Sequence, residues 1–498
     1  MYRYIVSLLV ILGGFSLSAQ NFEELKRKMY DEFSDFKSLQ ENKFESYRDE
    51  VNAEFAAFMR MAWKRYEGLP AVPEYPKVPD VPPVVLPDLG DPDIPDNELP
   101  YVDVIPLEFE DMPPVPLMPL SDVPEEPIKT EDPVVQMMFY GSECRFQFDL
   151  DDRVWLKGSS EEDAADMWSA MCGEGYDSLI MSVLQVRYDM NLCDWAYYSL
   201  AGSLSEHIYG ENNEAKLLTA FIMNQSGYKL RIARSDDGAF HILIGTDDGI
   251  YECPGFEVNG QMFYLTDGCD VSSLYVFDRE FPNEKALRLT ITDRQLFADD
   301  RSQERTLSSE EYPIAKVQVG VNVNLINFYN TYPHPFKKTG PPASWAFYAK
   351  APLSLHLERQ LLAPLAEAIA GRSQEESANI LINFVQTAFD YQTDDVQWGC
   401  ERSFFPEETL FYPYSDCEDR SILYARLIKD LMGLDVVFLY YPGHLATAVR
   451  FDEDVKGDYL VIDENKYIVC DPTYINAPIG MQMPGLEMKE INVIRINY

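Results

Sequence analysis

Three residues in the last fifth of the chain have types and an order that suit nucleophilic catalysis by a thiol. Cys417 begins a stretch with helical periodicity, His444 begins an alternating stretch, and Asp471 ends the next such stretch 27 residues later. An imidazole base that is itself oriented by a carboxylate activates a cysteine for attack on a carbonyl carbon. We therefore take Cys417, His444 and Asp471 as candidate catalytic residues.

The predicted position of Cys417 has opposing effects on its thiol. Ser415 or Asp416 is a natural N-cap, so the sulfur would lie near the positive end of a helix dipole, which favours the thiolate. The same turn contains three carboxylates, Asp416, Glu418 and Asp419. Their charges favour the protonated thiol, so a cationic partner is needed. His444 is the best placed of the chain's five histidines.

Each of these residues also has an ordinary structural interpretation. A cysteine at a helix start is more often buried than catalytic, and a histidine in a strand is usually structural. A disulfide from Cys417 to Cys400 or Cys470 is a third alternative, because oxidising compartments permit such bonds. The joint order of the three residues is what favours catalysis.

The elements that must position these residues occur twice along the chain. In the later set, a helix over 417–432 ends at Gly433 and is followed by strands over 434–441 and 444–451 and a hairpin over 464–474. In the earlier set, a helix over 212–226 precedes strands over 228–234 and 239–246 and a hairpin over 259–267. This earlier set is either a second, degenerate copy or an unrelated α+β domain.

The earlier set has two of the three candidate residue types at similar spacing. His241 and Asp267 are 26 residues apart, but no cysteine begins the helix, and the equivalent place falls within 211–214. If this is a second copy, it has lost its nucleophile.

The run YSDCEDRSILYARLIKDLMGLDVVFLYYPGHLATAV, with YIVCDPTYINAPIG after it, resembles the transglutaminase-like superfamily. In that family a D-C-x-D/E motif, a G-H before a strand and a D-P-T motif supply a triad. The resemblance covers residues 375–480 and implies a papain-like domain of the α+β class, with Cys417 as nucleophile, His444 as base and Asp471 as orienting carboxylate.

This resemblance implies acyl transfer from an amide or peptide bond. A thioester would form on the cysteine and be resolved by water or by an amine. The backbone N–H of Cys417 would supply one donor of the oxyanion hole. The candidates for a second donor are Trp398, Tyr391 and Tyr414.

The amino terminus and the charge limit the function classes. The first 20 residues combine one Arg, a short apolar run and small residues, the pattern of a cleaved signal peptide. An uncleaved anchor is the alternative, but the apolar run is shorter than the roughly 20 residues that span a bilayer. The net charge of −42 disfavours nucleic acids and anionic lipid. We therefore expect an exported protein, periplasmic or extracellular, with no stable membrane span after cleavage.

Composition divides the rest of the mature chain. Residues 21–67 have helical periodicity and predict an amphipathic helical segment. Residues 68–134 contain 18 of the chain's 33 prolines, which predicts an acidic linker that is a spacer, a recognition ligand or a cover for the folded part. An α+β domain over 135–340 and the transglutaminase-like domain over 341–498 follow.

Two functions remain open from the sequence. One is an exported thiol-dependent acyl-transfer enzyme with a protein or peptide substrate, acting as peptidase, amidase or transglutaminase. The other is a non-catalytic scaffold or binding protein of the cell envelope, with partners at the helical segment or linker. No cofactor is indicated, and the scattered histidines and cysteines motivate no metal site.

Overall fold

The structure is a computed structural model that describes residues 48–72, 83–87, 94–105, 133–268, 271–337, 344–486 and 490–496. The predicted signal peptide (1–20), residues 21–47 of the predicted helical segment and parts of the predicted linker lie outside the described residues. The chain divides into two units, Met1–Ala57 and Phe58–Tyr498. The described residues of the first unit, 48–57, are helical.

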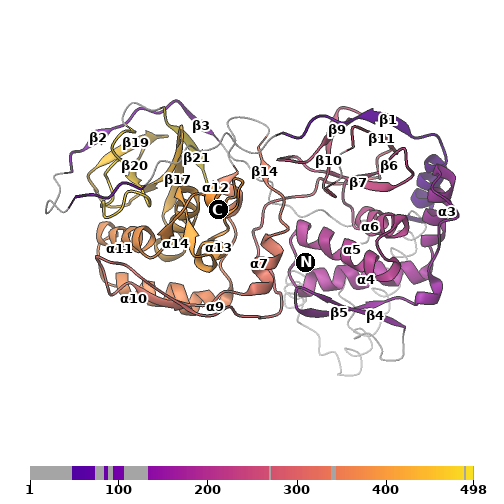
Figure 1. The fold of residues 1–498 in the computed structure, drawn as a ribbon, viewed down its shortest axis with the longest axis horizontal. Coiled ribbons are helices and arrows are strands. Elements are labelled where there is room, and N and C mark those ends of the chain that lie inside the picture. Colours follow the sequence, from indigo (N-terminus) through magenta and orange to yellow (C-terminus); the bar gives the residue numbers. More distant parts are fainter. Residues whose placement is uncertain are drawn as a thin grey trace, which may run out of the picture. The chain divides into compact units, whose positions relative to one another are not determined.

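The second unit has a mixed α/β structure that fits the predicted α+β class (Figure 1). One antiparallel sheet, the first sheet, has the order β1-β11-β6-β7-β10-β9. Its strands are β1 (Lys64–Glu67), β6 (Leu230–Arg234), β7 (Phe240–Gly245), β9 (Gly255–Val258), β10 (Gln261–Leu265) and β11 (Ser273–Val276).

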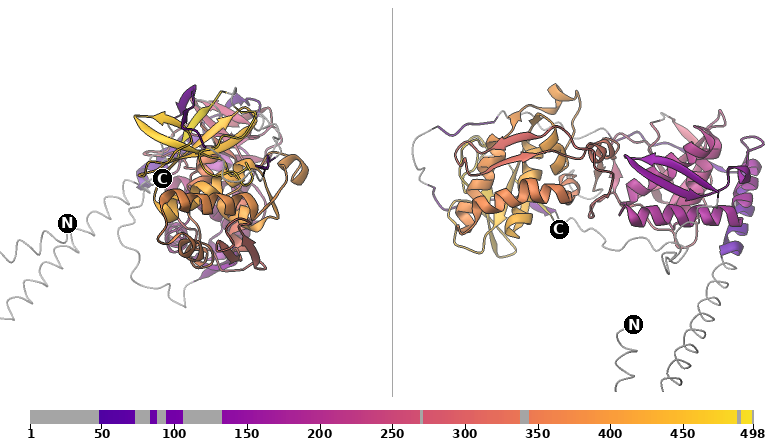
Figure 2. Two further views of the ribbon diagram at one scale, coloured as in Figure 1. Left: turned by 90° about the vertical axis from the view of Figure 1, so that its left-hand side faces the viewer. Right: turned by 90° about the horizontal axis from the view of Figure 1, so that it is seen from below.

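Helices cover the first sheet, and a hairpin packs on the helices. The helices are α3 (Glu161–Met171), α4 (Glu174–Asp189), α5 (Asp194–Tyr209) and α6 (Asn213–Gln225), and α6 contacts both β6 and β7. The hairpin strands β4 (Val134–Phe139) and β5 (Ser142–Gln147) contact α5 and α4 (Figure 2). A 3-10 turn, Leu150–Asp152, links the hairpin to α3.

The second sheet contains the strands that position the candidate catalytic residues, in the order β2-β19-β20-β18-β17-β21-β3. The five inner strands are β17 (Asp435–Tyr441), β18 (His444–Arg450), β19 (Asp458–Ile462), β20 (Asn465–Cys470) and β21 (Asn492–Arg495). They pair antiparallel, whereas β2 (Asn97–Glu98) and β3 (Asp103–Ile105) pair parallel at the two edges.

The two faces of the second sheet are covered by different parts of the chain. Helix α14 (Cys417–Met432) packs on β17 and β18, and α11 (Gln374–Thr387) packs on α14. On the other face, alternate residues of the strands form a core with a loop near the carboxyl terminus. Four residues of the predicted linker pack against this core: Val84, Leu86, Leu99 and Val104. The described part of the Pro-rich segment therefore covers the folded part.

Short elements join these two groups. The helices are α7 (Val323–Tyr329), α8 (Trp345–Ala349), α9 (Leu355–Leu357), α10 (Ala363–Ile369), α12 (Asp394–Gln397) and α13 (Pro406–Phe411), with a π turn over Glu358–Leu362. The strand pairs are β8 (Gly249–Ile250) with β14 (Pro335–Phe336), β12 (Arg305–Ser308) with β13 (Lys316–Val319), and β15 (Asp390–Tyr391) with β16 (Tyr414–Ser415).

The two large sheets share one topology. Numbered by their order in the chain, the five strands β6, β7, β9, β10 and β11 lie in the spatial order 5-1-2-4-3, and so do β17 to β21. In each case a helix, α6 or α14, comes immediately before the first strand and packs on the first two. This agreement supports the hypothesis of a degenerate second copy.

One sequence prediction fails at its end. The helical segment was expected to extend to residue 67, but the helix ends at residue 59 and Lys64–Glu67 is strand β1. β1 pairs antiparallel with β11, and Tyr66 packs against the core of the first sheet. Pairing at a sheet edge has therefore overridden the local helical pattern. No helix among the described residues has the length and hydropathy needed to cross a membrane.

Candidate functional site

Helix α14 places Cys417 at its first position. The predicted helix 417–432 matches the observed one, which ends at Gly433 in the left-handed conformation (φ +69°) that glycine adopts without strain. Every residue of the helix from Cys417 to Ala425 is buried, and Ser421 Oγ donates a hydrogen bond to the Leu445 carbonyl at 3.0 Å. The start of α14 is thereby fixed to the start of β18. Cys417 itself is only 4% exposed.

His444 and Asp471 form a buried pair. His444 is the first residue of β18, and Asp471 follows the last residue of β20, the neighbouring antiparallel strand. His444 Nε2 and Asp471 Oδ2 are 2.8 Å apart, and both side chains are buried. Asp471 Oδ1 accepts hydrogen bonds from the backbone N–H groups of Thr473 and Tyr474. The turn after β20 thus orients the carboxylate toward the imidazole.

Gln386 holds this turn in place, although no sequence pattern singled it out. Its Nε2 donates to the carbonyl oxygens of Asp471, Tyr474 and Ala477 at 3.0, 2.8 and 3.1 Å. Its Oε1 accepts from the Asn476 N–H at 3.1 Å. Gln386 lies in α11, within the residues 375–480 that the family resemblance covers, but its role depends on a contact across the fold.

The Cys417 thiol lies beside β18, but it makes no hydrogen bond with the imidazole of His444. The thiol donates to Glu418 Oε2 at 3.1 Å, and the Leu445 backbone N–H also interacts with it. His444 Nδ1 is buried and has no hydrogen-bond partner. With the proton on Nε2 shared with Asp471, Nδ1 is the nitrogen left to accept a proton.

The surroundings of the sulfur favour the protonated thiol in this state. Burial raises the pKa of Cys417 well above its ordinary value, and the charges of Glu418 and Asp416 raise it further. The Leu445 N–H lowers this pKa. The opposition between helix start and acidic neighbours expected from the sequence is therefore present, with the acidic neighbours and burial prevailing.

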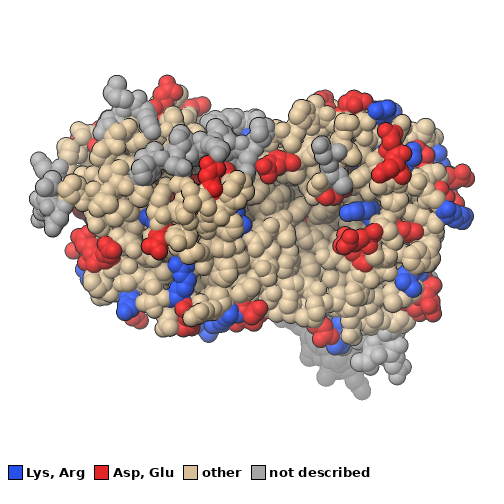
Figure 3. Space-filling model, viewed as in Figure 1, with Lys and Arg blue, Asp and Glu red and all other residues tan. Residues whose placement is uncertain are grey.

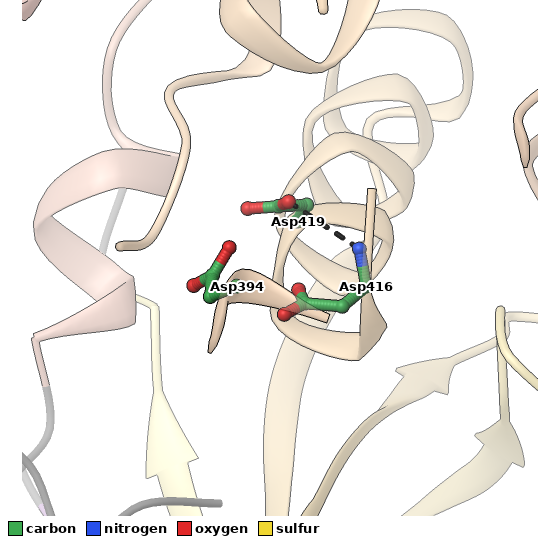
Figure 4. A group of neighbouring side chains, drawn as sticks. All are labelled: Asp394, Asp416 and Asp419. Carbon is green, nitrogen blue, oxygen red and sulfur yellow. Dashed lines mark hydrogen bonds between the residues drawn. The ribbon is translucent and has the colours of Figure 1, made fainter. Parts of the chain in front are cut away.

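Five carboxylates lie together near the start of α14. Asp394, at the start of α12, meets Asp416 and Asp419, and Figure 4 shows the three carboxylates converging. Asp394 also meets Glu401 and Glu418. Burial and mutual repulsion raise the pKa values of Asp394, Asp416 and Asp419. The sequence showed the acidic turn at 416–419 but not that Asp394 and Glu401 join it.

The three predicted candidates for a second oxyanion donor differ in their surroundings. Tyr391 is the best placed: its pKa is raised by burial and then by the charges of Cys417 and Asp416, so it remains a donor. Trp398 Nε1 is buried without a hydrogen-bond partner, while its ring contacts Phe404. Tyr414 is more than one-third exposed.

A cavity of about 160 Å³ lies next to the carboxylate group. Glu401 is one of its lining residues, together with aromatic and polar side chains that include Tyr329, Asn330, His334 and Arg402. Burial lowers the pKa of His334 to about 4, so this histidine is neutral near pH 7. Arg402 supplies the positive charge of the cavity and pairs with Glu408 at 2.5 Å.

Glu407 is a buried carboxyl outside this group, and it predicts a pH effect on stability. Its Oε1 accepts from the Ser354 N–H at 2.6 Å and its Oε2 has no partner. Burial raises its pKa from 4.5 to about 7. Between these two values the folded protein retains a proton that the unfolded chain releases, so stability is full below the lower value and falls as pH rises through the higher one.

We expect Glu407→Gln to reduce the loss of unfolding free energy between about pH 5 and about pH 8 by about 2–3 kcal/mol. Urea unfolding at the two pH values measures this difference. The same change at the exposed Glu162 is the control and should leave the pH dependence as it is. Equal pH dependence in the wild type and Glu407→Gln would show that Glu407 ionises normally.

The corresponding place in the first sheet has a different arrangement. His241 Nδ1 lies 2.8 Å from Asp267 Oδ2, and His241 Nε2 lies 3.1 Å from Ser235 Oγ. Asn213, the first residue of α6, stands where Cys417 stands in α14, and its Oδ1 accepts from the Phe240 N–H at 2.8 Å. The position that was predicted to lack a nucleophile therefore holds the side-chain amide of Asn213, which is hydrogen-bonded to the main chain.

The structural-disulfide alternative is wrong in this structure. In the described part of the chain, no disulfide joins Cys417 to Cys400 or to Cys470. Cys417 and Cys470 are both buried, but on different elements, at the start of α14 and the end of β20.

Comparisons with known proteins identified no relative of this chain. No family model matches the chain, and no curated protein or solved structure matches it. The function must therefore be argued from the geometry of the chain's own residues.

Proposed function

We propose that the chain is a thiol-dependent acyl-transfer enzyme whose carboxyl-terminal domain is transglutaminase-like. The observation that supports this most directly is the buried His444–Asp471 pair, which leaves Nδ1 without a partner at the strand start that the Cys417 thiol contacts. Base, orienting carboxylate and nucleophile thus come from β18, the end of β20 and the start of α14.

The proposed reaction begins when the thiol rotates from Glu418 toward His444 Nδ1. Nδ1 accepts the thiol proton as the sulfur bonds to the carbonyl carbon of an amide or peptide. The imidazolium, stabilised by Asp471, then protonates the departing amine and the carbon–nitrogen bond breaks. Water or a second amine attacks the thioester, and His444 accepts its proton. The sulfur leaves as the thiol when that proton returns.

The Cys417 N–H and the Tyr391 hydroxyl are the donors we propose for the developing oxyanion. The first lies at the start of a helix of 16 residues, where backbone N–H groups have no intrahelical acceptor. The second stays protonated because burial and nearby negative charge raise its pKa. Donors fixed in a dry site stabilise such a charge more strongly than water does.

Incubation with a peptide library and a fluorescent amine tests this proposal. Hydrolysed peptides and amine-labelled peptides are measured separately by mass spectrometry, together with any acyl adduct on Cys417. We expect turnover and the adduct to disappear in Cys417→Ala and to persist in Cys400→Ala, which removes an exposed cysteine. Turnover that persists in the Cys417→Ala variant would contradict the proposal.

A non-catalytic scaffold is the second candidate function. The observation that favours it is the Cys417 thiol, which is hydrogen-bonded to Glu418 rather than to His444. A scaffold would retain all binding partners and its cellular role in Cys417→Ala, as measured by pull-down and by phenotype. Loss of the phenotype with retained binding would reject the scaffold and leave the enzyme.

Export to the periplasm or the extracellular space is a further proposal, based on the first 20 residues. The substrate would then be a protein or peptide outside the cytoplasm. The described acidic and basic side chains are interspersed on the face drawn in Figure 3. Together with the net charge of −42, this favours a peptide over a nucleic acid as substrate. Cell fractionation and amino-terminal sequencing of the mature protein test the location.

A further inference from the structure

The cavity of about 160 Å³ next to the carboxylate group has an aromatic wall. Phe405 is stacked on Tyr329, with the ring centroids 4.0 Å apart, and its ring lies 5.0 Å from that of Tyr332 and 4.7 Å from that of Tyr348. All four residues line the cavity and are buried. Because each ring is held by its neighbours, the wall is formed before any ligand arrives.

The volume of this cavity fits one aromatic ring. A cavity of about 150 Å³ inside a protein can hold a molecule of benzene. Aromatic walls bind a further ring through offset-stacked or edge-to-face contacts, which aliphatic side chains cannot make. The cavity is therefore too small for a stretch of peptide and suits the ring of a single side chain.

Ser403 adds a hydroxyl group that the fold itself does not use. It lines the cavity and is 4% exposed, and its Oγ makes no hydrogen bond among the described residues. A buried hydroxyl group without a partner costs free energy, so a ligand that forms a hydrogen bond with it is favoured. His334 is a second polar residue of the lining. Its Nδ1 lies 3.1 Å from the Tyr348 hydroxyl, and no hydrogen bond of its Nε2 is found in the part of the chain that the structure describes.

Charges of both signs line the cavity, which favours a neutral ligand. Arg402 pairs with Glu408 at 2.5 Å. Burial and then the charge of Arg402 lower the pKa of His334 to about 4, so this histidine is neutral near pH 7. Glu252 and Glu401 are the remaining charged residues of the lining. A cation would be repelled by Arg402, and an anion would be repelled by the glutamates.

We propose that this cavity binds the phenol ring of a tyrosine side chain of the peptide substrate, with the phenol hydroxyl group hydrogen-bonded to Ser403 Oγ. This assignment rests on the proposed acyl transfer, because the cavity lies close to the proposed nucleophile. Glu401 lines the cavity, and one of its carboxylate oxygens lies within 4.8 Å of one of Glu418. Glu418 Oε2 in turn accepts from the Cys417 thiol. The tyrosine is therefore a residue near the cleaved amide.

Protection of Cys400 from iodoacetamide tests this binding without any turnover. Cys400 is exposed and lines the cavity, so a bound ring should slow its alkylation, which mass spectrometry measures. The full chain is used as the Cys417→Ala variant, so that the proposed nucleophile cannot react. We expect N-acetyl-tyrosinamide to protect Cys400 at a concentration at least about tenfold lower than N-acetyl-phenylalaninamide, which lacks the hydroxyl group.

Three results of this experiment would overturn the proposal. Equal protection by the two compounds would mean that the phenol hydroxyl group is not recognised. Stronger protection by N-acetyl-lysinamide would assign the cavity to a cationic side chain. No protection by any of the three compounds would mean that the cavity binds no side chain.

Matched serine variants separate the cavity from the general effect of a lost hydroxyl group. Ser403→Ala should abolish the preference for the tyrosine compound, because alanine offers no partner to the phenol. Ser344→Ala is the control and should keep the preference. Ser344 is 1% exposed and its Oγ also makes no hydrogen bond among the described residues, but it does not line this cavity. A preference that persists in Ser403→Ala would contradict the proposal.

A variant of an exposed residue remains informative if Ser403→Ala does not fold. Cys400→Trp adds a large side chain to the lining and should weaken the binding of N-acetyl-tyrosinamide at least about tenfold, as measured by calorimetry. Cys400→Ala should bind this compound as the wild type does. Equal affinities of Cys400→Trp and Cys400→Ala would place the binding elsewhere.

Turnover distinguishes failure of this proposal from failure of the proposed activity. Peptides with tyrosine near the cleaved amide should have a kcat/KM at least about tenfold higher than the same peptides with phenylalanine. Turnover at equal rates would reject the tyrosine site and keep the enzyme. Selective protection of Cys400 by the tyrosine compound without any turnover would keep the site and reject the enzyme.

Discussion

Cys417→Ala and His444→Ala are each expected to reduce the rate of acyl transfer by at least about 10³-fold. Alanine at position 417 removes the sulfur that forms the thioester. Alanine at position 444 removes the imidazole that we propose as the base. Since the two residues act as one unit, the double variant should be about as slow as either single variant. Rates of peptide hydrolysis and amine incorporation, measured at saturating substrate, check this.

Asp471→Asn separates orientation from proton transfer at the same site. The amide keeps the shape of the carboxylate but cannot stabilise the imidazolium, so we expect a loss of about 10²- to 10⁴-fold in kcat with a smaller change in KM. His241→Asn is the matched control, because His241 also pairs with an aspartate, but in the first sheet. If His241→Asn were to reduce the rate as much as His444→Ala, the assignment of the active site to the second sheet would be wrong.

Arg420→Met is expected to destabilise the protein by about 3–5 kcal/mol. The guanidinium is 1% exposed, and its nitrogens donate to the carbonyls of Gln386 and Phe389 and to Ser415 Oγ at 3.0, 2.8 and 3.2 Å. Methionine fills a similar volume but leaves these buried acceptors without donors. It also removes a positive charge that interacts with Asp416 and Asp419, so the repulsion between these carboxylates increases.

Urea unfolding of Arg420→Met beside Arg450→Met measures this effect. Arg450 pairs with Asp435 at the surface, where both side chains are more than one-third exposed. Exposed pairs of this kind contribute about 0–1 kcal/mol. Comparable midpoints for the two variants would mean that the hydrogen bonds of Arg420 add nothing to stability.

Local patterns predicted the elements around the site well. Helix α14 begins and ends where the apolar periodicity and Gly433 indicated, and β17 and β18 lie within the predicted strands. The prediction failed at residues 64–67, where the partner strand β11 is more than 200 residues away in sequence. A pattern within one segment contains no information about such a partner.

The candidate site could be predicted only in part for the same reason. The contact between His444 and Asp471 follows from the pairing of neighbouring strands, which the order of elements made predictable. The bond from the Cys417 thiol to Glu418 depends on side-chain rotamers and burial. The approach of Asp394 to the acidic turn depends on the path of the loop before α13, which no local pattern indicates.

The strands β2 and β3 have a consequence for any attempt to isolate the carboxyl-terminal half. Both come from the segment before residue 106, and they occupy the two borders of a sheet whose other strands all follow residue 434. A fragment that starts at residue 341 would leave the main-chain donors and acceptors of β19 and β21 open to strands of other molecules. Unprotected borders of this kind are templates for intermolecular strand addition. The half that bears Cys417 therefore needs the proline-rich segment to remain monodisperse.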